Sequence, residues 1–109
     1  GWAPEYVEAM RLMLQQEKPS DFVIATGRTR PLSDFIMLVF SKLGLDWREH
    51  LVSDPSLFRP SDIGASNLNP TKAHGELGWK AESGLEEIAG MMVDAMVECS
   101  SNGKITKAE

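Results

Sequence analysis

Residues 31–44, PLSDFIMLVFSKLG, carry the clearest structural pattern in this sequence. Their large apolar side chains recur at positions i, i+3, i+4, i+7, i+8 and i+11 counted from Leu32, the spacing of one helix face. Pro31 suits the start of a helix, and Gly44 suits its end because glycine tolerates the backbone conformation that closes helices. The pattern predicts an amphipathic helix over residues 32–43.

Upstream of this helix lies a second amphipathic pattern, followed by a short apolar run. Val7, Met10 and Leu14 share one face of a helix predicted over residues 4–16. Residues 22–25, FVIA, have the length and composition of a β-strand. Because the run is continuously apolar, the strand is expected to be buried on both faces and to need a neighbouring sheet or layer.

Two further helices are predicted downstream from their capping residues. The Asn-Pro pair at residues 69–70 favours the start of a helix over residues 70–77, and Gly78 favours its end. A Ser-x-x-Glu capping box at residues 83–86 opens a helix predicted over residues 84–98. The expected inner face of this last helix consists of Leu85, Ile88, Met92, Ala95 and Cys99.

The remaining segments are less regular. A single turn is expected at residues 46–48 and a short strand near residues 50–52. The polar residues 99–109 are expected to form a disordered tail, which leaves residues 1–98 as one domain. Together these patterns predict an α+β fold in which helices dominate.

Composition excludes several classes of protein. With 109 residues, 42% of them apolar, the chain suits one globular domain, and no apolar run approaches the ~18 residues of a membrane span. A net charge of −5 argues against general nucleic-acid binding. The single cysteine, Cys99, excludes an internal disulfide and is typical of a reducing compartment, so a cytoplasmic location is expected. The absence of an initiator methionine before Gly1 indicates a fragment or a processed chain.

No reaction centre can be assembled from the residues. The G-x-x-G-x-x-A spacing at residues 75–81 is rejected as a dinucleotide loop because no strand is predicted before it and its first glycine falls inside a helix. His50, His74 and Cys99 lack metal-ligand spacing. The only tyrosine, Tyr6, is not part of a Tyr-x-x-x-Lys pair. The chain is therefore expected to hold no catalytic, cofactor-binding or metal-binding residue.

The stretch LFRPSD at residues 57–62 supplies the candidate ligand-binding residues. The proline after Arg59 biases this arginine toward an extended backbone, and Asp62 follows three residues later. The guanidinium can fork onto the diphosphate of a sugar nucleotide, and the carboxylate can accept hydrogen bonds from ribose or base. The alternative is a surface turn with a solvated arginine.

Six segments of this sequence carry a family resemblance: GWAPEYVEAMRLMLQQ (1–16), DFVIATG (21–27), FRP (58–60), NPTKA (69–73), LGWK (77–80) and EEI (86–88). They resemble extended short-chain dehydrogenase/reductases that act on nucleotide sugars, and within them the GDP-mannose 4,6-dehydratase family.

The resemblance implies the C-terminal substrate-binding part of an enzyme that dehydrates GDP-mannose to a 4-keto-6-deoxy sugar. In the family, NADP and the catalytic residues belong to an N-terminal Rossmann domain, which this chain lacks, so the chain alone is expected to bind no NADP and to be inactive. The full-length protein is expected to form a homo-oligomer. Arg59 matches the family arginine that contacts the diphosphate, and Asp62 stands where the dehydratase usually has a glutamate that binds the nucleoside end.

Two other hypotheses remain. The chain could be a free-standing module that binds a protein partner or stabilises an oligomer. It could also be the same part of another nucleotide-sugar epimerase or dehydratase.

Overall fold

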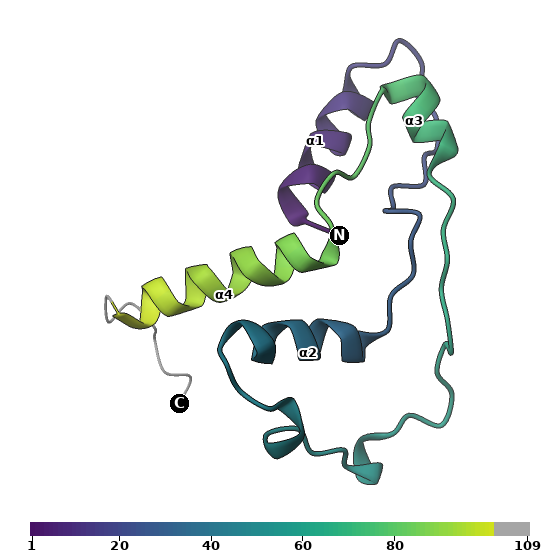
Figure 1. Ribbon diagram of the computed structural model, residues 1–109. Helices are drawn as coiled ribbons and strands as arrows, with labels where there is room; N and C mark the ends of the chain where they lie inside the picture. The colour runs from purple at the N-terminus through teal and green to yellow at the C-terminus, as the bar shows by residue number, and fades with distance from the viewer. Residues whose placement is uncertain (102–109) are drawn as a thin grey trace. The chain divides into compact units, whose positions relative to one another are not determined.

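The computed structural model describes residues 1–101, and helices dominate this part of the chain (Figure 1). No helix in the described part has the length and apolar character needed to cross a membrane. The helices are α1 (Ala3–Leu14), α2 (Leu32–Lys42), the 3₁₀ turns η1 (Trp47–Glu49) and η2 (Pro55–Leu57), α3 (Thr71–Leu77) and α4 (Leu85–Ser101).

The chain divides into two compact units, and each unit is built from separate stretches of sequence. Unit 1 contains α1, η2 and α3, and unit 2 contains α2, η1 and α4. The stretches are Gly1–Arg30 and Ser53–Gly84 for unit 1, and Pro31–Val52 with the chain from Leu85 onward for unit 2.

All four predicted helices are present, and their bounds agree with the predictions to within three residues. For α3, the capping predictions explain this agreement. The side chain of Asn69 accepts a hydrogen bond from the backbone N–H of Thr71 at 3.0 Å, and Gly78 ends α3 in the left-handed conformation with φ of 64°. Helix α4 continues to Ser101 and so includes the first residues of the predicted tail, while residues 102–109 of that tail lie outside the described part.

Both strand predictions are wrong, and residues 1–101 contain no strand. Residues 22–25 have no second strand to pair with, and a strand exists only when its backbone groups bond to a neighbour. The backbone at residues 50–52 is used differently. His50 and Leu51 donate to the carbonyl of Trp47 at 3.1 and 2.9 Å, so this segment closes the η1 turn.

Unit 1 is organised around one small apolar cluster. Its buried members are Ala9 of α1, Ala73 and Leu77 of α3, and Trp79 after α3. Ala9 and Ala73 are fully buried, and their small side chains let α1 and α3 lie side by side (Figure 1). The cluster is extended by partly buried side chains from α1 and from the segments next to the helices: Leu12, Met13, Phe22, Ile24 and Ala81.

The face of α1 that carries Val7, Met10 and Leu14 is not the face that packs against the cluster. Val7, Met10 and Leu14 are 62%, 59% and 86% exposed, while Ala9 and its neighbours face the cluster. Helix α1 carries apolar side chains on more than one side, and periodicity cannot tell which side finds a partner. The exposed residues Val7, Met10 and Leu14 are called the α1 stripe below.

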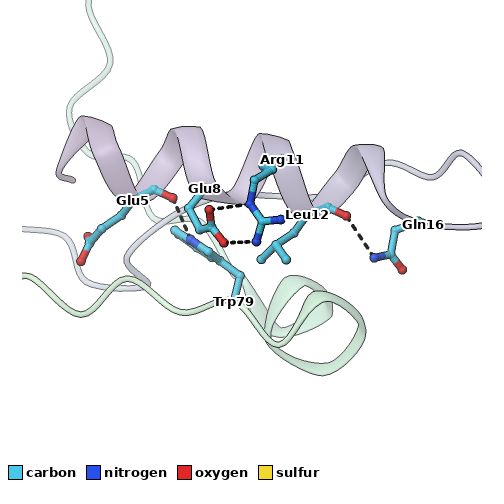
Figure 2. Close-up of polar contacts among 6 residues, drawn as sticks. All are labelled: Glu5, Glu8, Arg11, Leu12, Gln16 and Trp79. Carbon is cyan, nitrogen blue, oxygen red and sulfur yellow. Dashed lines mark hydrogen bonds and ion pairs between the residues drawn. The ribbon is translucent and has the colours of Figure 1, made fainter.

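A polar junction fixes the start of α1 to the chain that follows α3 (Figure 2). The indole Nε1 of Trp79 donates to the backbone carbonyl of Glu5 at 2.8 Å. The Glu5 side chain reaches the same segment: its Oε1 accepts from the backbone N–H groups of Glu82 and Ser83 at 3.1 and 2.9 Å, and from the Ser83 hydroxyl at 3.0 Å. One residue of α1 therefore holds residues 79–83 through both its backbone and its side chain.

The same bonds set the charge state of Glu5. Burial acts to raise the pKa of its carboxyl, but the hydrogen bonds from Ser83 and Glu82 outweigh it, so the pKa is lowered from its usual value. The second carboxylate oxygen, Oε2, is buried and has no hydrogen-bond partner among residues 1–101.

In unit 2, helix α2 packs against α4. Ile88, Ala89 and Val93 are the buried residues of α4, whereas Met92 and Ala95, which the sequence pattern assigned to the inner face, are exposed. Lys42 of α2 reaches Asp94 of α4 at 3.3 Å. Ile88 is thus correctly predicted as an inner residue, and the actual face lies along the 88/89/93 side of the helix.

The lowered pKa of Glu5 predicts acid sensitivity. A carboxylate with a lowered folded-state pKa contributes stability above its unfolded pKa, and this contribution is lost as the pH falls through the folded value. We expect the Glu5→Gln variant to show a weaker fall in the free energy of unfolding between about pH 7 and about pH 3. Urea denaturation followed by circular dichroism measures this. Ser83→Ala, which removes one of three donors, should show a smaller change, and a Glu5→Gln profile parallel to wild type would contradict the prediction.

The junction also predicts the effect of altering the indole. Trp79→Phe leaves the Glu5 carbonyl without its donor and reduces the volume of a buried ring, so we expect a loss of about 1–3 kcal/mol in the free energy of unfolding. Trp47→Phe in η1 is the matched control, because Trp47 is only half-buried. Equal losses of unfolding free energy in the two variants would show that the hydrogen bond and burial of Trp79 do not stabilise the protein more than the half-buried Trp47 does.

Candidate functional site

The candidate residues Arg59 and Asp62 lie in the segment between η2 and α3, in unit 1. Residues 58–69 form neither helix nor strand, and all of them are exposed. The structure brings the two candidates together: Arg59 Nε lies 3.7 Å from Asp62 Oδ2, and their side chains are 76% and 63% exposed. They form a surface ion pair.

The pair leaves part of the arginine available. The contact to Asp62 is made at Nε, and a guanidinium carries four more N–H donors on its two terminal nitrogens. The other carboxylate oxygen, Oδ1, accepts from the backbone N–H of Ile63 at 2.9 Å, which fixes the orientation of Asp62. The arrangement can therefore present a planar cationic fork to an anion, with an acceptor beside it.

The far end of the segment is anchored to an earlier turn of unit 1. Thr29 Oγ1 donates to the backbone carbonyl of Ser66 at 2.5 Å. Gly27, with φ of 76°, lies against Pro70, whose Cδ would be 3.4 Å from an added Cβ. The turn at residues 27–29 thus sets where the segment enters α3.

Lys72 is a positioning residue that the sequence patterns did not single out. Its Nζ donates to Ser20 Oγ at 2.6 Å and to the carbonyl of Asp21 at 2.8 Å, and it lies 4.8 Å from the centroid of the Phe22 ring. All three partners are about fifty residues away in sequence, so local periodicity carries no signal for this role. The one sequence feature that drew attention to Lys72 is its place in the NPTKA stretch, one of the segments that carry the family resemblance.

The groups set aside at the sequence level have ordinary surroundings. Gly75 lies within α3 and Gly78 is its C-terminal cap, so the glycine spacing belongs to a helix and its end. The imidazole of His50 stacks on Phe40 with ring centroids 5.3 Å apart. Cys99 is half-buried on α4 and makes no disulfide. Across the described residues, no three His, Cys, Asp or Glu side chains come together in a way that could hold a metal ion.

Comparison with known proteins adds what the site geometry alone does not. The family model for GDP-mannose 4,6 dehydratase matches residues 1–92. The chain belongs to the GDP-mannose 4,6 dehydratase family. This confirms the resemblance seen in the sequence, and the match includes Arg59, Asp62 and the whole of unit 1.

Individual relatives agree with the family assignment. The chain is 41% identical to GDP-mannose 4,6 dehydratase 1 of Arabidopsis thaliana over 96% of its own length and 29% of the relative's. It is 35% identical to the GDP-mannose 4,6 dehydratase of Dictyostelium discoideum (94% and 34%) and 34% identical to that of Homo sapiens (90% and 31%). The chain therefore spans about a third of the length of these relatives.

The exposed ion pair predicts that Arg59 contributes little to stability. Exposed pairs are worth about 0–1 kcal/mol, so Arg59→Ala should change the free energy of unfolding of the 109-residue chain by less than about 0.5 kcal/mol. Lys72→Ala, which loses two hydrogen bonds and a cation–π contact, should cost about 1 kcal/mol or more. Urea denaturation of both variants measures these changes. A loss of stability in Arg59→Ala well above the expected value would show that Arg59 has a structural role.

Proposed function

We propose that this chain is the C-terminal, substrate-binding part of a GDP-mannose 4,6-dehydratase that uses NADP. The observation that carries the proposal is the family match over residues 1–92, together with relatives of that name at up to 41% identity. The coverage of about a third of each relative supports a part of a longer enzyme. In this proposal GDP-mannose is the substrate, and its product is GDP-4-keto-6-deoxymannose.

Arg59 and Asp62 are the binding residues in this proposal. Arg59 binds the diphosphate through its terminal nitrogens, and Asp62 accepts from the nucleoside end. Their ion pair supports this assignment because Asp62 holds the guanidinium at Nε and leaves its other donors toward solvent. The aspartate is shorter than the glutamate usual in the family, so its reach to the nucleoside is tested separately by Asp62→Glu.

In this proposal the catalytic residues and the cofactor site belong to the other two thirds of the full-length enzyme, which the chain does not match. The sequence supports this division, since it has no glycine-rich loop after a strand and no Tyr-x-x-x-Lys pair. We therefore propose that the 109-residue chain alone neither holds NADP nor turns over GDP-mannose. We also propose a homo-oligomeric full-length protein in the cytoplasm, a location that the single cysteine favours.

Uncovered apolar surface supports a role within a larger protein. The α1 stripe is exposed in unit 1, and Met92 and Met96 are exposed along α4 in unit 2. Exposed apolar groups at helical spacing are typical of surfaces that normally meet another part of a protein. The alternative that the same surface recruits a separate partner makes a different prediction for activity.

Activity is tested with a chimera in which this chain replaces the matched segment of the Arabidopsis relative. We expect the chimera to convert GDP-mannose in the presence of NADP, and the 109-residue chain to show no conversion. Chromatographic separation of substrate and product measures both. Turnover by the 109-residue chain would contradict the proposal. A folded but inactive chimera, with the free chain self-associating, would favour the partner-binding module instead.

The role of Arg59 is tested in the same chimera. Removing a charge-assisted fork should weaken GDP binding roughly tenfold or more, because ~1.4 kcal/mol is a factor of ten. Arg59→Lys should also lose affinity, since an ammonium cannot reproduce the fork. Calorimetric titration with GDP measures both variants, and Arg48→Ala, an arginine of unit 2 that lies near Asp46, is the control. Unchanged affinity in Arg59→Ala would remove Arg59 from the site.

A further inference from the structure

Residues 28–33, RTRPLS, form a motif that the proposed function does not use. Ser33 has one arginine three residues before it and another five residues before it, Arg30 and Arg28. No other serine or threonine of the chain has an arginine three residues before it. Serine kinases that choose substrates by positive charge bind arginines at these two positions with carboxylates of the substrate groove, which is recognition by complementary charge. The spacing therefore points to an arginine-directed serine kinase.

The structure leaves this motif accessible. All six residues are exposed, and Leu32, directly before the serine, is 74% exposed. Residues 28–31 form neither helix nor strand, and Pro31 has an extended backbone with φ of −63° and ψ of 146°. Ser33 is the second residue of α2, and helices fray at their ends. A kinase groove that binds an extended peptide can therefore reach this serine.

The hydroxyl of Ser33 has no structural role in the described part of the chain. It makes no hydrogen bond to any of residues 1–101. Other hydroxyls are engaged: Ser83 Oγ donates to the carboxylate of Glu5 at 3.0 Å, and Thr29 Oγ1 donates to a backbone carbonyl at 2.5 Å. Modification of Ser33 therefore breaks no contact of the folded chain.

The fold also accepts a negative charge at this position. Pro31 is the N-cap of α2, and no side chain caps this end of the helix with a hydrogen bond. A phosphate carries a charge of about −1.5 to −2 at pH 7, and negative charge is favourable in the first turn of a helix. Asp34 in the same turn opposes the phosphate by like charge, whereas the arginines that precede it in the chain have the opposite charge.

We propose that Ser33 is phosphorylated by an arginine-directed serine kinase, with a nucleoside triphosphate as the phosphoryl donor. The Ser33 oxygen forms a bond to the γ-phosphorus, and the bond from this phosphorus to the β–γ bridging oxygen breaks. The nucleoside diphosphate leaves, and the hydroxyl proton passes to a base of the kinase. The inference goes beyond the proposed function and does not depend on it, because the whole motif lies in the 109-residue chain.

The test is phosphorylation of the purified 109-residue chain by protein kinase B, with adenosine triphosphate and magnesium. Mass spectrometry of peptides should locate a phosphate at Ser33, and Ser33→Ala should remove it. A synthetic peptide of residues 26–36 is the reference for the same motif without a fold. The kcat/KM values for the chain and the peptide should agree within roughly tenfold, as expected for a segment that the fold leaves open.

Arginine variants test the recognition. Arg28→Gln removes a guanidinium that makes no ion pair within the described residues, and it should lower kcat/KM for phosphorylation roughly tenfold through the loss of one charge pair. Arg28→Lys should lose less, because it keeps the charge and loses only the fork. Arg11→Gln is the matched control and should have no effect, since no serine or threonine lies three or five residues after Arg11.

The possible results are distinct. Phosphorylation of the peptide but not of the folded chain shows that the fold covers the motif and overturns the proposal. Equal rates for wild type and Arg28→Gln overturn recognition by charge. Loss of helix content on phosphorylation, measured by circular dichroism, shows that the fold does not accept the phosphate and overturns the site.

The chimera with the Arabidopsis relative separates this inference from the proposed function. We expect Ser33 to be phosphorylated in the chimera as in the free chain, and mass spectrometry measures this independently of turnover. An active chimera without phosphate at Ser33 overturns the site in the full-length enzyme and leaves the proposed function standing. A phosphorylated chimera that does not convert GDP-mannose supports the site and overturns the proposed function.

Discussion

The burial of Trp79 against α1 is the contact on which unit 1 depends. The indole fills the space beside Ala9 and the tilted ring of Tyr6, whose centroid is 5.9 Å away, and its one polar atom is satisfied by the carbonyl of Glu5. A buried tryptophan without that acceptor would carry an unpaired N–H into an apolar site. Because α3 ends at Gly78, directly before Trp79, the position of the ring also sets the position of α3. The segment with Arg59 and Asp62 leads into α3, so the position of α3 also sets the position of the end of this segment.

Local features of the fold could be predicted from the sequence because their causes are local. The helix over residues 32–43 follows from apolar spacing, and the ends of α3 follow from Asn69 and Gly78, whose side chain and backbone act within a few residues. What could not be predicted depends on distant partners. Val7, Met10 and Leu14 have the spacing of an inner face, yet the partners in unit 1 approach from the Ala9 side. The segment at residues 22–25 has strand composition, but pairing requires a second strand that residues 1–101 do not contain.

The candidate site divides in the same way. Arg59 and Asp62 are three residues apart, so their pairing could be anticipated from the sequence, and the structure places them in contact. Lys72 could not be anticipated, because its contacts join it to residues 20–22 across the fold. Glu5 lies in the first turn of α1, where an acid favours the positive end of a helix, but its carboxylate also holds the backbone at residues 82 and 83, which no local pattern indicates. Candidate residues proposed for their own chemistry leave a sequence signal, and residues that act by positioning others leave almost none.

The interleaving of the two units along the chain has a consequence for how the protein folds. Unit 1 is assembled from Gly1–Arg30 and Ser53–Gly84, so its core cannot close until the intervening stretch of unit 2 has been synthesised and looped out. The Glu5–Trp79 bond spans 74 residues, and contacts of such sequence separation carry a large loop-closure entropy and form slowly. No single cut of the polypeptide can separate the units as intact pieces. A polypeptide that ends before residue 79 would hold α1 without the ring that covers it, so the packing of α1 depends on a residue 70 positions and more downstream.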